Sequence, residues 1–408
     1  MSSASEFSFV RKYYEKYSRA LGKDGGCLLL GKIIQMGNGF LVSVYLVKTF
    51  GLGAVGTYTI ASIATSAIAF ICSFGLSNSL PRDNFSNAQR NTISLAILTL
   101  AVPLAALLIG GYAWMMGHDF QEITEIAVFS AAGYLFAQSN IVNTLLLLQG
   151  RTRLSVVPPL LNCAGILLGM VSAETLFQFG MMFIASRLLG NVLLFINMQY
   201  EPVGWSVILQ QAKKGAKFLP MDLMSQFSEQ LVSFMLAILL PRTELGIFGL
   251  CRQVVYAAIT PGWSHVDASY PQFVSSRLEN ADSVKKQNRA LSNLATVLVI
   301  CGSFVLGIFV YKIPQFWFMC ILLAFSIPSR YLGYFYDKIL RSAGQVKTCN
   351  YVTFARICLS MAIFPIFVLS FQLWGAILGW VLLSLLSLIL WQRAARPVLE
   401  KETIAAVI

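Results

Sequence analysis

The chain has 408 residues, of which 57% are hydrophobic and only 12% are charged, and its mean hydropathy is +0.69. An ordinary globular domain carries roughly 25% charged residues, so this composition excludes a soluble fold and a disordered chain. The net charge of +12 would suggest nucleic acid as the partner of a soluble protein. In a membrane protein, the positions of the basic residues relative to the bilayer must be considered first.

Residues 1–24 are too charged for a cleavable signal peptide. Phe7, Val10, Tyr14 and Tyr17 recur there at helical spacing with basic residues among them. The pattern predicts an amphipathic helix at the membrane interface, with a disordered tail as the alternative.

The rest of the chain reads as a series of membrane spans. About 20 apolar residues cross a bilayer as a helix, and twelve such segments follow one another with short loops between them. They lie at about residues 25–47, 54–77, 91–114, 124–147, 154–171, 174–197, 217–240, 245–269, 290–310, 314–336, 350–370 and 373–391. We therefore predict an all-α polytopic membrane protein with twelve transmembrane helices.

Basic residues alternate between the two sides of this arrangement. Most of the 30 Lys and Arg residues fall in the two tails and in the loops after the even-numbered spans. The opposite loops hold only Lys48, Arg242 and Lys312. Because basic loops stay in the cytoplasm, both termini are predicted to be cytoplasmic. The orientation of the chain in the membrane and its contact with lipids then account for the net positive charge, and no nucleic-acid partner is needed.

Two motifs recur after six spans. L-G-x-x-G stands at residues 52–56 and again at 245–249, and a G-polar-x-basic pattern stands at 150–153 and at 344–347. The copies are separated by 193 and 194 residues. An offset of six helices preserves topology, so the pattern predicts two parallel six-helix repeats with a substrate site between them.

The repeat sets the expected domain organisation. The predicted parts are a cytoplasmic amphipathic segment at 1–24, an N-terminal half at 25–197, a cytoplasmic linker at 198–216, a C-terminal half at 217–391 and a cytoplasmic tail at 392–408.

These features resemble the multidrug/oligosaccharidyl-lipid/polysaccharide exporter superfamily, and in particular its Wzx-type polysaccharide (O-antigen) flippases. Besides the twelve helices in two halves and the L-G-x-x-G openings, the resemblance rests on E-L-G-I-F at 244–248, Y-P-Q-F at 270–273 and L-Q-G-R at 148–151. It covers nearly the whole chain in architecture.

The resemblance implies a function in O-antigen and lipopolysaccharide biosynthesis. Such a protein moves undecaprenyl-diphosphate-linked oligosaccharide from the cytoplasmic to the periplasmic leaflet of the bacterial inner membrane. A central V-shaped cavity between the two halves would alternate its access. The implied partners are the lipid-linked glycan, membrane lipids, a coupling cation (H⁺ or Na⁺), a polysaccharide polymerase and a chain-length regulator.

Charged residues inside the predicted spans are the main candidates for function, because each costs at least about 2.5 kcal/mol if it faces lipid at mid-depth. Cations exceed anions among them, which favours an anionic headgroup such as a diphosphate, and Arg can bind phosphate through two hydrogen bonds. The predicted substrate-binding residues are Lys32, Gln35, Asn38, Arg187, Arg252, Arg330 and Arg356. The alternative is that these side chains snorkel to the interface or pair between helices.

Three acids form a second set. Asp222 and Glu229 share one face of a span, and Asp267 lies near the inner end of the next. A carboxylate in an apolar setting can carry a proton or bind Na⁺, so we predict a role in ion coupling. A salt bridge to a cavity arginine is the alternative for the first two, and solvation at the interface for the third.

Other functions are weighed against this one. A drug or cation antiporter of the same fold is the main alternative, although its cavity should be dominated by acids. No catalytic constellation, cofactor motif or metal-ligand spacing is found, so we predict neither an enzyme nor a bound cofactor. The eight cysteines are expected to pack within helices. Five tryptophans near span ends are expected to be interface anchors: Trp114, Trp205, Trp263, Trp317 and Trp391.

Overall fold

The computed structural model describes residues 30–407, apart from 81–82, 84, 150, 218, 276–280 and 314. The amphipathic segment expected at 1–24 lies outside the described residues, as does Gly150 of the repeated G-polar-x-basic pattern. Nearly every described residue is helical and none is in a strand, which agrees with the all-α fold class.

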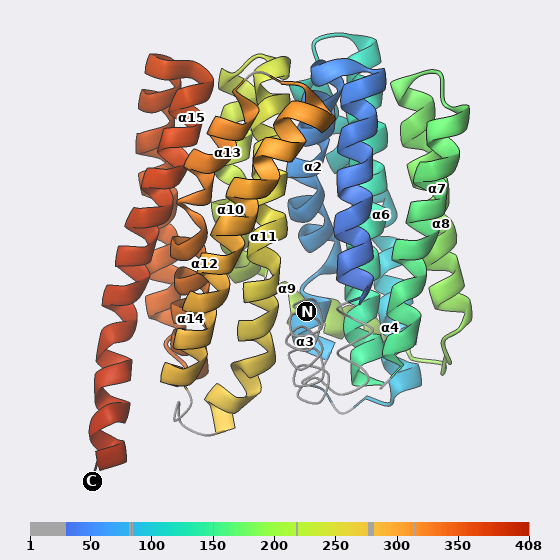
Figure 1. The fold of residues 1–408 in the computed structure, drawn as a ribbon. Coiled ribbons are helices and arrows are strands. Elements are labelled where there is room, and N and C mark those ends of the chain that lie inside the picture. The colour runs from blue at the N-terminus through green and yellow to red at the C-terminus, as the bar shows by residue number, and fades with distance from the viewer. Residues whose placement is uncertain are drawn as a thin grey trace, which may run out of the picture. The chain divides into compact units, whose positions relative to one another are not determined.

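The helices follow one another as Figure 1 shows. The first half contains a helix at Leu30–Thr49, then α2 Gly51–Ser73, α3 Leu76–Ser79, α4 Asn87–Leu100, α5 Val102–Met116, α6 Phe120–Leu148, a 3₁₀ turn at Thr152–Val156, α7 Val157–Ser172, α8 Leu176–Ile196 and α9 Trp205–Ala216. The second half contains α10 Leu219–Leu239, α11 Arg242–Ser275, α12 Ala281–Val305, a π-helical turn at Leu306–Tyr311, α13 Phe316–Ala324, α14 Ile327–Ser342 and α15 Val346–Val407.

Every predicted span coincides with a helix or a helix pair. Seven helices of the described residues are long and apolar enough to cross a membrane, or eight if the pair α4 and α5, bent by 41°, is one span. Two predicted spans, 350–370 and 373–391, are merged in α15, where Gln372 has non-helical backbone angles. The layout is consistent with a multi-pass protein of twelve spans.

Local sequence signals explain where several helices start. Ser86 and Gln89 form a capping box at the start of α4, and Thr175 and Gln178 form another at the start of α8. In each, the hydroxyl accepts from the N3 amide while the glutamine side chain accepts from the N-cap amide. The linker expected at 198–216 contains a helix of its own, α9.

The chain divides into two compact units. Unit 1 comprises residues 1–42 and 64–222, and unit 2 comprises residues 43–63 and 223–408. The start of α2 therefore belongs to unit 2, together with the C-terminal half. The domain bounds expected from the sequence stay a prediction.

Each unit has its own apolar core. In unit 1, α2, α5 and α6 meet at Ile68, Cys72, Ala105 and Tyr134. In unit 2, α11, α12, α14 and α15 meet in a cluster that includes Val266, Phe273, Val284, Phe335 and Trp391. The second cluster fixes how α14 is turned about its axis.

The two L-G-x-x-G motifs pack against each other within unit 2. A Cβ added at Gly56 would overlap the carbonyl group of Arg242, and one added at Gly246 would overlap the carbonyl oxygen of Leu52. The start of α2 and the start of α11 thus cross with their backbones in direct contact. Small residues allow this approach between membrane helices. The two copies of the motif that recurs in the sequence therefore contact each other in the structure.

This crossing makes a stability prediction with an internal control. Gly56→Ala and Gly246→Ala should each destabilise the protein, because overpacking of a tight contact costs about 1–3 kcal/mol. Gly53→Ala, in the same motif but with open space around it, should be neutral or slightly stabilising because alanine favours a helix. The measurement is the Tm of the purified protein in detergent. Equal Tm values for the three variants would contradict the crossing.

Candidate functional site

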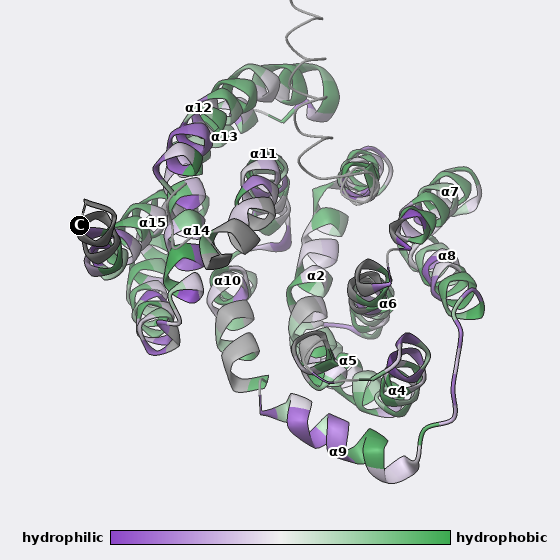
Figure 2. Cartoon of the chain, turned by 90° about the horizontal axis from the view of Figure 1, so that it is seen from below, coloured by the Kyte–Doolittle hydropathy of each residue, from purple (hydrophilic) through white to green (hydrophobic). Residues whose placement is uncertain are grey.

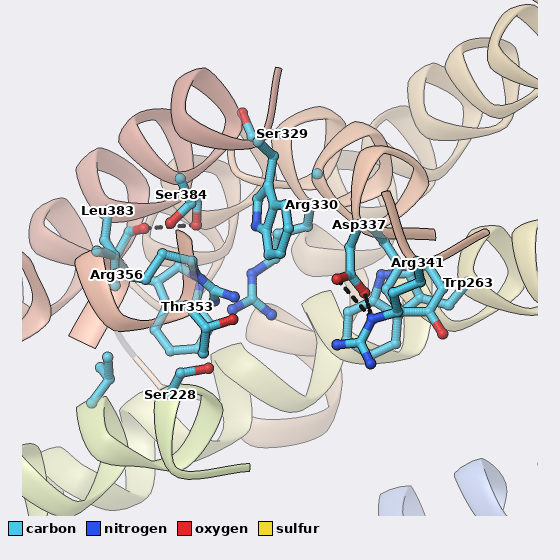
Figure 3. A pocket seen from close by; sticks show the side chains of 16 residues that line it. Ser228, Trp263, Ser329, Arg330, Asp337, Arg341, Thr353, Arg356, Leu383 and Ser384 are labelled. Carbon is cyan, nitrogen blue, oxygen red and sulfur yellow. Dashed lines mark hydrogen bonds and ion pairs between the residues drawn. The ribbon is translucent and has the colours of Figure 1, made fainter. Parts of the chain in front are cut away.

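A cavity of about 270 Å³ lies within unit 2, between α10, α11, α14 and α15 (Figure 3). Three arginines and one aspartate line it: Arg330, Arg341, Arg356 and Asp337. Its aromatic lining is Trp263, Tyr334, Trp380 and Trp391, and its hydroxyl lining is Ser228, Ser329, Thr353, Ser384 and Ser387. The cavity therefore combines an excess of positive charge with rings and hydroxyl groups.

One face of α14 supplies much of this lining. Arg330, Tyr334, Asp337 and Arg341 are spaced by three or four residues, so they lie on one side of the helix. The opposite side carries Phe335 and Ile339, which are fully buried in the core cluster. The amphipathic pattern of α14 thus turns its polar face to the cavity.

Specific hydrogen bonds hold α14 in this orientation. The Tyr331 hydroxyl donates to the carbonyl of Ala258 on α11 over 2.7 Å. The buried Asn288 amide on α12 donates to the carbonyl of Tyr331 over 3.0 Å. A side chain at Gly262 would overlap the Tyr331 ring, so the glycine lets α11 and α14 approach. These contacts fix the direction in which Arg330 points.

Aromatic rings hold the guanidinium groups near the cavity. The Arg330 guanidinium lies 4.4 Å from the centroid of the Trp380 ring and 5.1 Å from that of Tyr256. Arg252 contacts the same two rings, at 5.7 Å and 5.0 Å. Cation–π contacts of this kind strengthen when water is excluded. The guanidinium groups of Arg252 and Arg330 therefore lie over the same two rings within unit 2.

Arg252 is also held by polar groups on α10. It donates to the Ser233 hydroxyl and, over 3.3 Å, to the Gln230 side-chain oxygen. It does not itself line the cavity, but it adds positive charge behind Trp380, which does. The side chains of Trp263 and Tyr334 stack with centroids 5.2 Å apart, which extends the aromatic wall.

Asp337 and Arg341 form an ion pair in the wall of the cavity. The Arg341 Nε lies 2.9 Å from both carboxylate oxygens of Asp337. The Arg341 and Asp337 side chains are 34% and 13% exposed, so the pair is only partly screened by solvent. Arg330 and Arg356 point their guanidinium groups into the same part of the cavity (Figure 3). An anion bound there would meet at least these two cations.

The structure brings some of the predicted substrate-binding residues together. Arg330 and Arg356 line the cavity, and Arg252 lies behind it. The other four belong to unit 1 and are not part of this cavity: Lys32, Gln35, Asn38 and Arg187.

Within unit 1, Asn38 and Arg187 are held by specific contacts. Asn38 is 3% exposed and its amide donates to the carbonyl of Pro159 over 2.8 Å. Arg187 donates to the side-chain oxygen of Asn162 over 2.9 Å and lies over the rings of Phe136 and Phe183. Lys32 is exposed and Gln35 is half-buried.

The predicted ion-coupling acids lie on the helices that flank the cavity. Asp222 and Glu229 are on α10 and Asp267 is on α11, but their side chains are outside the part of the chain that is described. Ser228, next to Glu229, lines the cavity. The coupling role of the three acids stays a prediction.

Several lining residues differ from the sequence expectation. Asp337 and Arg341 follow the span predicted at 314–336 and are not among the predicted site residues, and Trp263 and Trp391 are expected to be interface anchors, but all four line the cavity. Trp380 carries no expectation at all. The spacing of Arg330, Asp337 and Arg341 places them on one helical face and could have predicted the site. This prediction requires that the helix extends past residue 336.

The thiols and acids do not suggest a metal centre. Within the described ranges, no three or more His, Cys, Asp or Glu side chains gather to hold a metal ion.

The chain has the fold of MATE transporters. An inward-facing multidrug resistance MATE family transporter of the MOP superfamily matches with a TM-score of 0.69 and 13% identity, over 92% of this chain and 98% of that one. The MATE multidrug transporter DinF-BH, in a complex with a ligand, matches with a TM-score of 0.67 and 15% identity, over 91% and 94%.

A third similar structure differs in its binding pocket. A MOP superfamily transporter from Pyrococcus furiosus, for which reverse polarity of the binding pocket suggests a different function, matches with a TM-score of 0.58 and 13% identity, over 95% of this chain and 98% of that one. No protein-family model matches the sequence, and no curated protein matches it. At these identities the similarity establishes the fold.

The ion pair between Asp337 and Arg341 predicts how substitutions change the binding of an anion in the cavity. Asp337→Asn removes the carboxylate that competes for Arg341, so the affinity for inorganic pyrophosphate should rise by roughly fivefold, the equivalent of about 1 kcal/mol for a partly exposed pair. Arg341→Gln should weaken binding. The measurement is calorimetric titration of the purified protein, with Asp282→Asn on α12 as the control. Unchanged affinity in Asp337→Asn would show that Arg341 does not contact the anion.

Proposed function

We propose that this chain is an alternating-access membrane transporter that moves undecaprenyl-diphosphate-linked oligosaccharide, an O-antigen-type repeat unit, from the cytoplasmic to the periplasmic leaflet. The observation that supports this most is the charge of the cavity in unit 2, where three arginines face one aspartate. The MATE fold supports transport in general, because the similar structures are transporters.

The chemistry of the cavity suits a diphosphate joined to a sugar. Guanidinium groups bind phosphate oxygens through paired hydrogen bonds, and their attraction is strengthened where low-dielectric walls exclude water. The stacked rings of Trp263 and Tyr334 line the cavity beside the space for a sugar ring, and Thr353 and Ser384 offer hydroxyl groups to its oxygens. A volume of about 270 Å³ accommodates a headgroup and not a whole oligosaccharide.

The remaining parts of the proposal come from the sequence. The protein would lie in the bacterial inner membrane with both termini in the cytoplasm, and its V-shaped cavity would open between the two halves. A proton or sodium gradient would drive transport through Asp222, Glu229 and Asp267. The lipid-linked glycan, membrane lipids, a polysaccharide polymerase and a chain-length regulator would be its partners.

A drug or cation antiporter is the second candidate. Two of the similar structures are multidrug transporters, one of them in a complex with a ligand. Asp337 and the aromatic wall could hold an organic cation by charge and cation–π contact. Against this, Arg330 and Arg356 place two positive charges in the same cavity. The reversed pocket polarity of the Pyrococcus furiosus transporter is a precedent for a change of function on this fold.

A deletion experiment separates the two candidates. Loss of the protein in its bacterial host should leave lipid-linked glycan on the cytoplasmic leaflet and abolish the surface polymer. Wild-type protein should restore the polymer, and the double variant Arg330→Gln and Arg356→Gln should restore less than a tenth of it, because about 1.4 kcal/mol of lost binding is already tenfold. Lys347→Gln, an exposed lysine at the start of α15, is the matched control. Drug sensitivity with an intact surface polymer would instead support the antiporter.

Ion coupling is tested separately. Glu229→Gln should reduce transport into proteoliposomes under an imposed proton or sodium gradient, and should leave the residual transport independent of that gradient, because glutamine cannot exchange a proton or balance a cation. Asp282→Asn, outside the predicted coupling set, should retain the dependence. Wild-type-like transport and gradient dependence in Glu229→Gln would exclude the residue from coupling.

A further inference from the structure

The linker helix α9 lies crosswise to the spans of unit 1. In Figure 2 it is seen along its length, whereas α7 and α8 are seen end on. The chain that leads to it is tied to the start of α4, because the Thr92 hydroxyl donates to the carbonyl of Glu201 over 2.7 Å. The apolar exposed side of α8 ends at Ile196, which is 71% exposed. Helix α9 therefore lies at the level where the membrane spans of unit 1 end.

One face of α9 is fastened to unit 1. Ile208 is buried in a cluster with Leu76 and Ile93, and a side chain at Gly215 would overlap the carbonyl oxygen of Phe74. Lys214 donates to Asp83 over 3.0 Å. Burial by itself would raise the pKa of Asp83, but hydrogen bonds from Lys214 and Gln211 and the charges of Lys214 and Arg90 outweigh it and lower the pKa. These contacts fix the rotation of α9 about its axis.

A second face of α9 is apolar and uncovered. Trp205 and Leu209 are one helical turn apart, and they are 55% and 53% exposed. Ala212, at the edge of this stripe, packs against the cluster around Ile208, and Ala216 beyond it is partly exposed. Tryptophan and leucine on an exposed stripe beside apolar spans are typical of a helix whose apolar side enters the headgroup–acyl boundary.

A third face is basic and adjoins the apolar stripe. Lys213 follows Leu209 by four residues, and Lys217 follows Lys213 by four, and both are exposed. No acidic residue lies between Trp205 and Lys217. The order around the helix is thus a protein-bound face, an apolar face and a cationic face. A water-exposed linker has no need of this order, whereas a helix lying in an anionic lipid surface requires it.

We propose that α9 is an interfacial helix that binds anionic phospholipids of the leaflet on the side where the basic loops of the protein lie. Trp205 and Leu209 insert at the acyl boundary, and Lys213 and Lys217 contact headgroup phosphates with their alkyl stems along the surface. Because α9 precedes residue 222, where unit 1 ends, lipid binding immobilises the segment that joins the two units in the chain. The inference does not depend on which substrate the protein transports.

Amide hydrogen exchange of the full-length protein in nanodiscs tests the headgroup contact. Exchange across α9 should be slower in discs containing phosphatidylglycerol than in pure phosphatidylcholine, by roughly tenfold or more for two lysines at an anionic surface. Lys213→Gln with Lys217→Gln should abolish this difference, whereas Lys347→Gln, an exposed lysine outside α9, should keep it. Exchange that is the same in both lipids, or a difference that survives the double variant, would overturn the proposal.

Fluorescence tests the apolar contact separately. The emission of Trp205 is the difference between the wild-type protein and Trp205→Phe, and brominated lipids should quench this difference because the indole lies within reach of the acyl chains. If brominated lipids leave this difference in emission unquenched, Trp205 lies in water and the insertion is overturned. Both experiments use intact, folded protein, and the variants alter only exposed side chains, so loss of folding does not produce the expected result.

Discussion

A cation buried among apolar helices has to be stabilised by the protein, and this constraint shapes unit 2. The hydrocarbon chains of lipid cannot accept a hydrogen bond from a guanidinium group, so each half-buried arginine must find a ring, a polar side chain or a charged partner. Arg330 and Arg252 share the rings of Tyr256 and Trp380, and Arg341 binds Asp337. The cavity lies on the side of α14 where these arginines and their partners gather.

Close helix contact makes that convergence possible. Tyr331 reaches Ala258 only because Gly262 leaves room for its ring, and the bond sets the rotation of α14. A rotation of α14 by half a turn would place Arg330 in the core and Phe335 in the cavity. The crossing of α2 with α11 through Gly56 and Gly246 follows the same principle. In both places a glycine leaves room for its neighbour, which is the Tyr331 ring at Gly262 and the backbone of the other helix at Gly56 and Gly246.

The candidate site was only partly predictable from the sequence. Arg330 and Arg356 stand out because a charge within an apolar run is costly, and that argument needs no tertiary information. Asp337 and Arg341 carry the same charges, but the expected end of the span near residue 336 placed them in a loop. The helix continues to Ser342, so they extend the polar face of α14. Trp263 and Trp391 fit the rule for interface anchors by position, yet their rings face the cavity.

The membrane class, the positions of the helices and the recurrence of the L-G-x-x-G motif can be predicted from the sequence. They follow from composition, apolar segment length and local spacing, because these properties belong to each stretch of the chain separately. The charges that share a cavity, the rings that hold them and the contact between the two motifs are seen first in the folded chain. Those depend on the rotation of each helix, which is set by bonds such as that from Asn288 to Tyr331 between residues far apart in the sequence.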